Sequence, residues 1–482
     1  MADRASSLFT AAPRSHPHVK RFVDAWFCDP DFPAAFEADP AKVLAGLGID
    51  LDPDDLSVLV SPEETGILTR PDLPRPEGEA TVVAEWRDHA LERFRAIRRE
   101  RRERSPVCPA LARWRWRQIG RLGFELGSSL AGQIRHIPFA FELTSGCSGR
   151  CWFCGVSAQP LDGVFERSDA NVELFRGLLA RLVEVFGAAS ASDGILYWAT
   201  DPIDHPEYES FIDDYAEIVG VAPTTVTALA GRQPDRAASI LDRLKVHPPR
   251  THRFSLLSPR DYHTVIERFD AEDLASVELL PQYRKDLGLK FAVGRARTRM
   301  ASDKGTKIPP RTGTIACLSG LIIDLVGGTI RLSTPCPGSD ATPDGVHESS
   351  PRPFCGLAEG LEVIEELVEE LKRSHPTPDL PILHAEGVEF LDSEDPGVVR
   401  VVSSHRGLRI ESSVRAAVLT EATTGRFGVE GFVNALVEEG GATVHEAASL
   451  LDRLADAGVV RWPFSGEQGP KVILGRHLRN VH

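Results

Sequence analysis

Residues 139–155 read FAFELTSGCSGRCWFCG, a short apolar run that leads directly into a loop with three cysteines. An apolar run bounded by turn-forming residues is typical of a buried strand. Cys147, Cys151 and Cys154 follow it with the spacing C-x3-C-x2-C. Three thiolates on one tight loop are suited to bind three irons of a [4Fe–4S] cube, which leaves the fourth iron open to a small molecule. A zinc site would need a fourth Cys or His at matching spacing, and none follows nearby. The remaining alternative is that the three cysteines are core residues without a chemical role.

The middle of the chain alternates short apolar runs with helical patterns. The apolar runs lie at residues 139–143, 195–198, 225–229, 253–257, 290–293 and 321–326. Amphipathic helical patterns at 171–186 and 208–219 lie between some of them. This β, α, β, α rhythm, which continues to about residue 335, predicts a parallel sheet covered by helices.

Composition excludes several classes of protein. The chain of 482 residues is 42% hydrophobic and 26% charged, which is ordinary for a globular protein of about three domains. Its net charge of −15 makes it a poor general binder of nucleic acid, because phosphate contacts need positive surface. No apolar run approaches the ~20 residues of a membrane-spanning helix, and residues 1–15 lack the apolar core of a signal peptide. We therefore expect a cytoplasmic protein, whose 8 cysteines are metal ligands, reactive thiols or core residues.

Helical segments precede the cysteine loop. Apolar residues in 16–70 recur at helical spacing, and Gly48 is expected just after a helix end. Residues 80–121 are expected to form a helix rich in arginine, including Arg115 and Arg117. Such a stretch is most often a solvated face. The alternatives are an anchor for an acidic peptide or an interface between domains.

The cysteine spacing, with the aromatic Phe153 before the last cysteine, resembles the radical S-adenosylmethionine (SAM) superfamily. In that superfamily the open iron binds SAM. Reductive cleavage of SAM gives methionine and a 5′-deoxyadenosyl radical, which abstracts hydrogen from the substrate. The resemblance therefore implies a [4Fe–4S] cluster and SAM as cofactors.

Four further residues fall where that superfamily places contacts to SAM. Residues 199–202 read ATDP where the superfamily pattern is Gly-Gly-Glu-Pro, so the resemblance assigns SAM contacts to Thr200 and Asp201. It assigns a contact with the SAM carboxylate or ribose to Ser255 and a contact with the carboxylate to Arg295. A polar residue at a strand end is more often structural, which is the alternative for each.

A closer resemblance is carried by several segments that occur in the same order along the chain. They are ELTSGC at 142–147, CWFCG at 151–155, YWATDP at 197–202, RFSLLS at 253–258, GRA at 294–296 and TPC at 334–336. Together they resemble the radical SAM peptide epimerases of the proteusin type, which convert L-residues of a ribosomally made precursor peptide into D-residues. The resemblance covers roughly residues 16–400. It implies a precursor peptide and a flavodoxin or ferredoxin as partners, with no part for nucleic acid or membrane.

The fold that this resemblance implies is α/β, a partial (β/α)6 barrel of the TIM type with a helical domain before it and a small domain after it. We expect a helical leader-like domain at 1–75, a basic helical connector at 76–135, the barrel at 136–345, an extension at 346–410 and a winged-helix-like domain at 411–482. Residues 22–49 resemble the nitrile-hydratase-like leader peptides of the epimerase substrates.

The end of the chain has a helical pattern at 361–373 and then the signals of a winged helix. Short helices are expected at 414–419, 431–438 and 444–455, and a strand at 459–462. Thr443 and Glu446 form a capping box before the last helix. That helix is acidic, so DNA binding is not expected. The two interpretations are a domain that binds a leader peptide and a structural cap.

Epimerisation removes hydrogen from Cα and returns another to the opposite face, and a cysteine thiol is a suitable donor because its S–H bond is weak. Functional residues of β/α barrels lie at the carboxyl ends of strands. Cys336 follows the last expected strand, with proline on both sides, and is our candidate donor; Cys317 is the second. The alternative for either is a small buried hydrophobic residue. Cys317, Cys336 and Cys355 are evenly spaced and could also bind a second iron–sulfur cluster. The lack of a close cysteine pair after residue 154 disfavours this alternative.

Two other classes of function remain open. A different radical SAM modification of a peptide, a carbon–carbon or thioether crosslink, removes two hydrogens, whereas epimerisation leaves the peptide mass unchanged. A non-catalytic iron–sulfur sensor or leader-binding module forms no 5′-deoxyadenosine under strong reductant.

Overall fold

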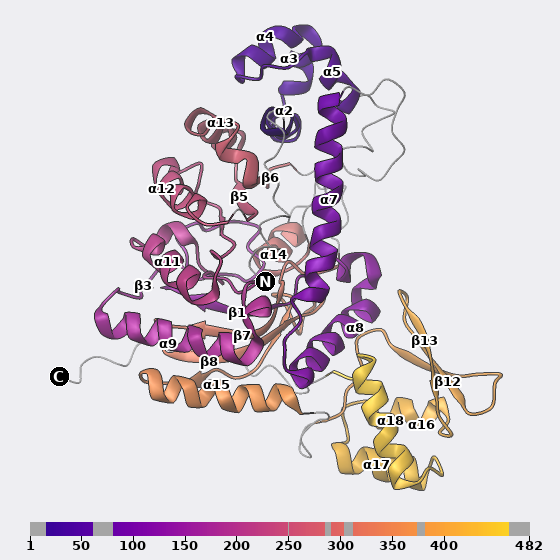
Figure 1. The fold of residues 1–482 in the computed structure, drawn as a ribbon. Helices are drawn as coiled ribbons and strands as arrows, with labels where there is room; N and C mark the ends of the chain where they lie inside the picture. The colour runs from indigo at the N-terminus through magenta and orange to yellow at the C-terminus, as the bar shows by residue number, and fades with distance from the viewer. Residues whose placement is uncertain are drawn as a thin grey trace. The chain divides into compact units, whose positions relative to one another are not determined.

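The computed structural model describes residues 16–60, 81–248, 250–284, 291–302, 312–373 and 381–461 (Figure 1). The chain divides into two compact units, each assembled from separate stretches. Unit 1 comprises Met1–Pro106, Ile137–Lys290 and Ile323–Gly328, and unit 2 comprises Val107–His136, Phe291–Ile322 and Thr329–His482.

Unit 1 begins with short helices, of which the first two share a cluster of aromatic side chains. They are α2 (His16–Cys28), α3 (Phe32–Ala38), α4 (Pro40–Gly46), α5 (Pro53–Ser57) and η1 (Val58–Val60), followed by the long α7 (Thr81–Glu103). The rings of Phe22, Trp26, Phe32 and Phe36 form one cluster, with centroids 5.1–6.5 Å apart. Gly48 has φ +66° just past α4, which confirms its expected place after a helix end. The boundary expected between the first two domains lies outside the described residues.

Helix α2 is bonded to the rest of unit 1 through main-chain carbonyls. Arg21 donates to the carbonyls of Ile266 at 2.7 Å and Phe269 at 2.9 Å. Arg284 donates to the carbonyl of Phe27 at 3.0 Å, near the end of α2. The leader-like segment is thus docked on its own chain.

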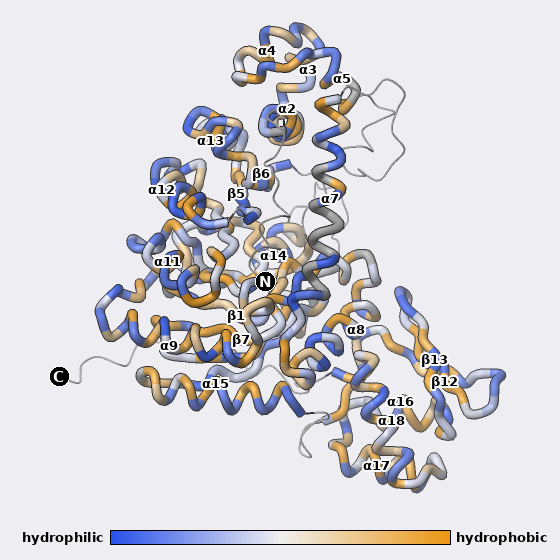
Figure 2. The backbone as a smooth tube through the Cα atoms, in the orientation of Figure 1, coloured by the Kyte–Doolittle hydropathy of each residue, from blue (hydrophilic) through white to orange (hydrophobic). Residues whose placement is uncertain are grey.

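The parallel sheet of unit 1 contains β4 (Val226–Thr227), β5 (His252–Leu256) and β6 (Val277–Pro281), in that order. The helices around it are α9 (Asp169–Phe186), α10 (Ala188–Ala191), α11 (Tyr208–Val219), α12 (Pro234–Lys245) and α13 (Pro259–Arg268), with the turns η2 (Pro202–Asp204) and η3 (Asp273–Ser276). Figure 1 shows α11, α12 and α13 in succession beside the sheet, and apolar residues recur along α9 as in an amphipathic helix (Figure 2). The α/β rhythm of this part is confirmed.

The strand expected at 195–198 of unit 1 is reduced to a single bridge at Ile195. β1 (Ile137–Glu142) is buried at every position and forms a parallel bridge from Ala140 to Ile195. Residues 196–198 do not continue as a strand. Within the described residues the strands form separate sheets, and none of these sheets closes on itself.

The strands of unit 2 correct the expectation that the parallel rhythm continues to about residue 335. β8 (Thr329–Pro335) pairs antiparallel with β9 (Val346–Glu348) and with β10 (Arg352–Pro353). The segments that join these strands are too short for the helical crossover that parallel pairing requires. The strand expected at 321–326 is present in part as β7 (Leu318–Asp324), whereas residues 325 and 326 belong to the turn that leads to β8.

Two further expectations meet the structure between residues 285 and 372. The run at 290–293 does not form a strand in its described part, and residues 285–290 lie outside the described residues. α14 (Gly294–Ser302) follows it. The helix expected at 361–373 is present as α15 (Leu357–Lys372).

Residues 80–121 do not form one helix, which corrects the expectation. α7 ends at Glu103, and a separate helix, α8 (Pro109–Ala131), begins at Pro109. Proline suits the first turn of a helix and keeps the preceding residue extended, so it favours a new helix at this point. Arg115 and Arg117 on α8 are each 3% exposed, so the solvated-face interpretation is wrong for them. Arg117 pairs with Asp456 at 2.6 Å inside unit 2.

The C-terminal subdomain (residues 381–461) is a sheet followed by helices. Its antiparallel strands are β11 (Glu389–Asp392), β12 (Val398–Val402) and β13 (Gly407–Glu411), and its helices are α16 (Ala416–Ala422), α17 (Val429–Glu438) and α18 (Val444–Asp456). Side chains from all six elements share one hydrophobic cluster. The three helices and the capping box of α18 are confirmed, whereas the sheet was not expected. Of the strand expected at 459–462, Val460 forms one bridge with His384, and residue 462 lies outside the described residues.

Among the helices of the described residues, none is both long and apolar enough to cross a membrane.

We predict that Thr443→Ala loosens the first turn of α18. Thr443 Oγ1 accepts from the Glu446 amide at 3.2 Å, and Glu446 accepts from the Thr443 amide at 2.7 Å. Loss of a cap costs about 1 kcal/mol, so amides of α18 should exchange hydrogen about fivefold faster. Val444→Ala, at a neighbouring side chain that is 65% exposed, is the control. Equal exchange in both variants would contradict the capping account.

Candidate functional site

The three cysteines lie on one loop between two short paired strands of unit 1. β2 (Thr144–Ser145) pairs antiparallel with β3 (Gly163–Val164), and together they close residues 146–162 into an excursion. Inside it, the amide of Cys147 donates to the carbonyl of Gln159 at 2.8 Å. The loop that carries the cysteines is therefore closed by the pairing of β2 with β3 and by the hydrogen bond of the Cys147 amide.

Glycine is required where this loop leaves β2. Gly146 has φ +77°, in the left-handed region that favours glycine. An added Cβ would lie 2.3 Å from the carbonyl oxygen of Pro160, which is closer than non-bonded atoms approach. A side chain at Gly146 would thus push apart the two ends of the cysteine loop.

Two side chains from distant parts of unit 1 hold the loop. Asp204, at the end of η2, accepts hydrogen bonds from the Ser148 amide at 2.9 Å and from the Ser148 hydroxyl at 2.5 Å. Arg232 donates Nη1 to the carbonyl of Gly149 at 3.2 Å. Sequence reasoning missed both residues. They are separated from their partners by 56 and 83 residues, and neither belongs to a motif.

Main-chain amides point at two of the three sulfurs. The Gly149 amide donates to Cys147 Sγ at 3.3 Å, and the Ala158 amide donates to Cys154 Sγ at 3.4 Å. A Cβ added to Gly149 would lie 3.3 Å from Cys147 Sγ and 3.4 Å from Cys151 Sγ, so these two sulfurs lie near the same side of Gly149. Burial raises the pKa of Cys147 to about 12, against the effect of the Gly149 amide.

The donor set of the loop is three thiols, which are the usual protein ligands of iron–sulfur clusters. Within the described residues, no group of three or more His, Cys, Asp or Glu side chains is arranged to hold one metal ion. A cube binds each cysteine to a different iron, so its ligands need not converge on one point. Soft thiolates select Fe–S clusters, and hydrogen bonds to their sulfurs tune such clusters. The assignment of Cys147, Cys151 and Cys154 as iron ligands stays a prediction.

Asp201 is buried, with 4% exposure, and accepts three hydrogen bonds. Its Oδ1 accepts from the Ile203 amide at 3.0 Å and the Thr227 hydroxyl at 2.7 Å, and its Oδ2 accepts from the Ala228 amide at 2.8 Å. Burial raises the pKa of Asp201 to about 6, and the hydrogen bonds oppose this rise. Asp201 therefore fastens η2 to the carboxyl end of β4, and its contact to SAM stays a prediction.

The turn before Asp201 keeps a glycine-like backbone without glycine. Ala199 has φ +47°, a conformation that costs an L-residue roughly 1–2 kcal/mol. The superfamily pattern has glycine at this position. Thr200 follows and is partly exposed, and its SAM contact is likewise a prediction.

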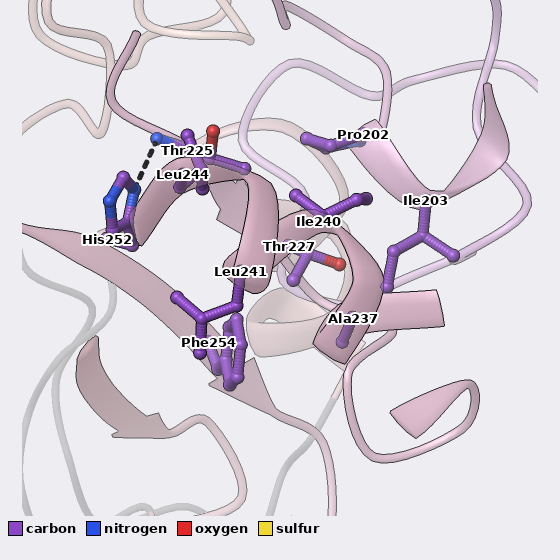
Figure 3. A pocket seen from close by; sticks show the side chains of 10 residues that line it. All are labelled: Pro202, Ile203, Thr225, Thr227, Ala237, Ile240, Leu241, Leu244, His252 and Phe254. Atoms are coloured by element: carbon purple, nitrogen blue, oxygen red, sulfur yellow. Dashed lines mark hydrogen bonds between the residues drawn. The ribbon is translucent and has the colours of Figure 1, made fainter. Parts of the chain in front are cut away.

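Ser255 and Arg253 share one face of β5, because alternate residues of a strand point to opposite faces. The opposite face carries His252 and Phe254, which line a pocket against α12 (Figure 3). Ser255 is buried and faces away from that helix, whereas Arg253 is paired with Glu278 at 2.8 Å. The contact of Ser255 with SAM stays a prediction.

The pocket in Figure 3 is a packing layer rather than a reactive site. Its lining, mostly apolar, consists of Pro202, Ile203, Thr225, Thr227, Ala237, Ile240, Leu241, Leu244, His252 and Phe254. The Thr225 amide donates to His252 Nδ1 at 3.3 Å. Burial lowers the pKa of His252 to about 4, so the ring is neutral at pH 7.

The predicted site residues divide between the two units. Unit 1 contains Cys147, Cys151, Phe153, Cys154, Thr200, Asp201 and Ser255, and unit 2 contains Arg295, Cys317 and Cys336. The ring of Phe153 meets that of Trp152 edge-on at 5.8 Å. Arg295 is in the first turn of α14.

The two candidate hydrogen donors differ in exposure. Cys336 directly follows β8 and is 1% exposed, and its amide donates to the carbonyl of Gly345 at 2.9 Å. Burial raises the pKa of Cys336 to about 12, so the group is a thiol at neutral pH. Cys317 directly precedes β7 and is partly exposed.

No family model matches this chain. It is 32% identical over 458 residues to the uncharacterized protein y4wI of Sinorhizobium fredii, an alignment that covers 93% of this chain and 87% of that protein. At this identity and coverage the chain belongs to the same family as that protein. Among solved structures, the crystal structure of BtrN in complex with AdoMet and 2-DOIA has a TM-score of 0.29 and 16% identity, over 40% of this chain and 72% of BtrN. That likeness is too low to define the fold.

We predict that Gly146→Ala opens the cysteine loop. The left-handed φ alone costs roughly 1–2 kcal/mol, and the contact with Pro160 adds to it. The Cys147 amide should lose its protection from hydrogen exchange. Gly356→Ala is the matched control, since Gly356 has φ +84° with nothing within 4 Å of the added Cβ. Unchanged protection of Cys147 in the Gly146 variant would contradict the described closure.

Proposed function

We propose that the cysteine loop of unit 1 binds a [4Fe–4S] cluster with SAM, and that the protein is a radical SAM epimerase acting on residues of a ribosomal precursor peptide. The observation that carries the first half is the loop itself, with three cysteines at C-x3-C-x2-C spacing behind a buried strand. Two sulfurs accept main-chain hydrogen bonds there, as cluster ligands do. The peptide and the epimerisation rest on the ordered segments that resemble peptide epimerases.

The bound cluster would supply one electron that cleaves SAM into methionine and a 5′-deoxyadenosyl radical. Cys147, Cys151 and Cys154 would hold three of its irons. Phe153 would pack beside SAM, and Thr200, Asp201, Ser255 and Arg295 would bind its polar groups. The bonds of Asp204 and Arg232 to the loop support this assignment, because they fix the main chain between the first two cysteines.

Cys336 is the proposed hydrogen donor, with Cys317 as the alternative. Once hydrogen has been removed from a Cα of the peptide, the Cys336 S–H bond would break as a new Cα–H bond forms on the opposite face. The sulfur radical left behind takes one electron and one proton to become a thiol again. A flavodoxin or ferredoxin would supply that electron. Burial keeps Cys336 in the thiol form that this step needs.

The rest of the expected organisation belongs to the same proposal. A partial (β/α)6 barrel would contain the cluster site, and the C-terminal subdomain would either be a structural cap or bind the leader of the precursor. The parallel strands β4, β5 and β6 and the parallel bridge of β1 support the barrel. We propose a cytoplasmic location, since reduced thiols and a cluster need a reducing compartment.

We predict that the protein, supplied anaerobically with SAM, reductant and the precursor peptide encoded beside it, adds one deuteron at Cα of each modified residue in D2O. A thiol exchanges its proton with solvent, so hydrogen returned from Cys336 arrives as deuterium. Mass spectrometry and chiral amino-acid analysis of the peptide measure this result.

Cys336→Ala should abolish the D-residues while 5′-deoxyadenosine is still formed. Cys355→Ala is the matched control, because Cys355 is an exposed cysteine of the same unit. D-residues from the Cys336 variant, but not from Cys317→Ala, would move the donor role to Cys317. A peptide that loses two hydrogens would identify a crosslinking enzyme and overturn epimerisation.

A further inference from the structure

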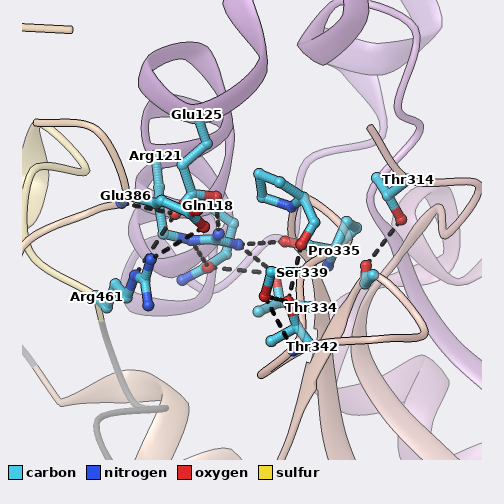
Figure 4. A network of polar contacts seen from close by, with 12 residues as sticks. Gln118, Arg121, Glu125, Thr314, Thr334, Pro335, Ser339, Thr342, Glu386 and Arg461 are labelled. Carbon is cyan, nitrogen blue, oxygen red and sulfur yellow. Dashed lines mark hydrogen bonds and ion pairs between the residues drawn. The ribbon is translucent and has the colours of Figure 1, made fainter. Parts of the chain in front are cut away.

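A buried arginine donates a hydrogen bond to the main-chain carbonyl just before Cys336. Arg121, on α8, is 2% exposed, and its Nη2 donates to the carbonyl of Pro335 at 2.5 Å (Figure 4). The same nitrogen reaches Thr334 Oγ1 at 3.3 Å, and Nε donates to Gln118 Oε1 at 3.2 Å. A guanidinium has its donors in a rigid plane, so these bonds fix the end of β8 relative to α8.

The segment after Cys336 is held from the other side. The amide of Cys336 donates to the carbonyl of Gly345, and Thr314 Oγ1 donates to that same carbonyl at 2.8 Å. Thr342 Oγ1 donates to the carbonyl of Pro337 at 2.8 Å. The main chain on both sides of the thiol is therefore bonded, and Arg121 is the charged member of the set.

Glu125 connects this arginine to the C-terminal subdomain. Its Oε2 pairs with Arg121 at 2.5 Å, and its side chain is 0% exposed. Its Oε1 lies 3.6 Å from Arg461 Nε and accepts from the Glu386 amide at 3.4 Å. Arg461 also lies 3.7 Å from Glu386 Oε2 (Figure 4). One buried carboxylate thus joins two cations, one on α8 that bonds the end of β8 and one in the subdomain.

The helix that carries Arg121 and Glu125 is packed closely on that subdomain. A Cβ added to Gly120 would lie 2.6 Å from the carbonyl oxygen of Ala457, just past α18. Ser403 Oγ donates to the carbonyl of Phe124 at 2.9 Å. Movement of the subdomain would therefore act on α8 directly.

We propose that Arg121 is a positioning residue for the Cys336 thiol, and that Glu125 and Arg461 make this positioning depend on the C-terminal subdomain. The inference rests on the proposed function for the meaning of Cys336 as a hydrogen donor. It adds a route by which the C-terminal subdomain sets the position of the donor. A buried charge chain suits this role, because removal of one member leaves the others without compensation.

The test compares Arg121→Gln and Arg461→Gln with wild type by two measurements. The first is the alkylation rate of Cys336 by iodoacetamide, relative to exposed Cys355 in the same sample. The second is the number of 5′-deoxyadenosine molecules formed per D-residue. We expect each variant to raise both quantities about fivefold, as for coupling through a packed network. Arg453→Gln is the matched control, since Arg453 is an exposed arginine of the subdomain that bonds the Glu411 carbonyl instead.

Arg461→Gln carries the test if Arg121→Gln fails to fold, because Arg461 lies at the edge of the network with 17% exposure. Wild-type values of both quantities in a folded Arg461 variant would overturn the coupling. The alkylation measurement needs no substrate. If wild type forms no D-residue at all, the proposed function fails, and alkylation alone then decides whether the chain from Arg461 controls Cys336.

Discussion

Two carboxylates at the ends of one short turn connect the cysteine loop to the sheet of unit 1. Asp201, just before η2, accepts from Thr227 and Ala228 at the end of β4, while Asp204 accepts from Ser148 between the first two cysteines. The loop is thereby attached to the parallel strands rather than only to its neighbours in sequence. The position of any group bound by the three thiols depends on this turn. The cost of burying the Asp201 carboxylate is offset by the hydrogen bonds that both of its oxygens accept.

Unit 2 uses buried charge in a different way. Arg121, Glu125 and Arg461 form a chain in which every charged group has a partner, and its first member bonds the carbonyl before Cys336. Removal of one member of such a chain leaves a buried charge uncompensated, so the position of each member is tied to the others. The two candidate chemistries, the thiolate cluster and the thiol donor, therefore have separate supports, each within one compact unit.

Local signals in the sequence predicted local structure well. The strand before Cys147, the glycine after α4 and the capping box of α18 each depend on residues within a few positions, and the structure contains all of them. Long-range pairing was not predictable in the same way. The antiparallel partners of β8 and the burial of Arg117 against Asp456 depend on contacts across the fold. For the site, cysteine spacing identified the loop, but Asp204, Arg232 and Arg121 are ordinary polar residues until folding brings their partners near.

The central claim is that Cys147, Cys151 and Cys154 hold a cluster that cleaves SAM, and formation of 5′-deoxyadenosine by the reconstituted protein tests it most directly. The protein would be loaded anaerobically with iron and sulfide, reduced, and given SAM without peptide. The account predicts 5′-deoxyadenosine from wild type and from Cys355→Ala, and none from Cys151→Ala. Wild-type protein that binds its full iron and forms no 5′-deoxyadenosine, or a Cys151 variant that forms as much as wild type, would contradict it.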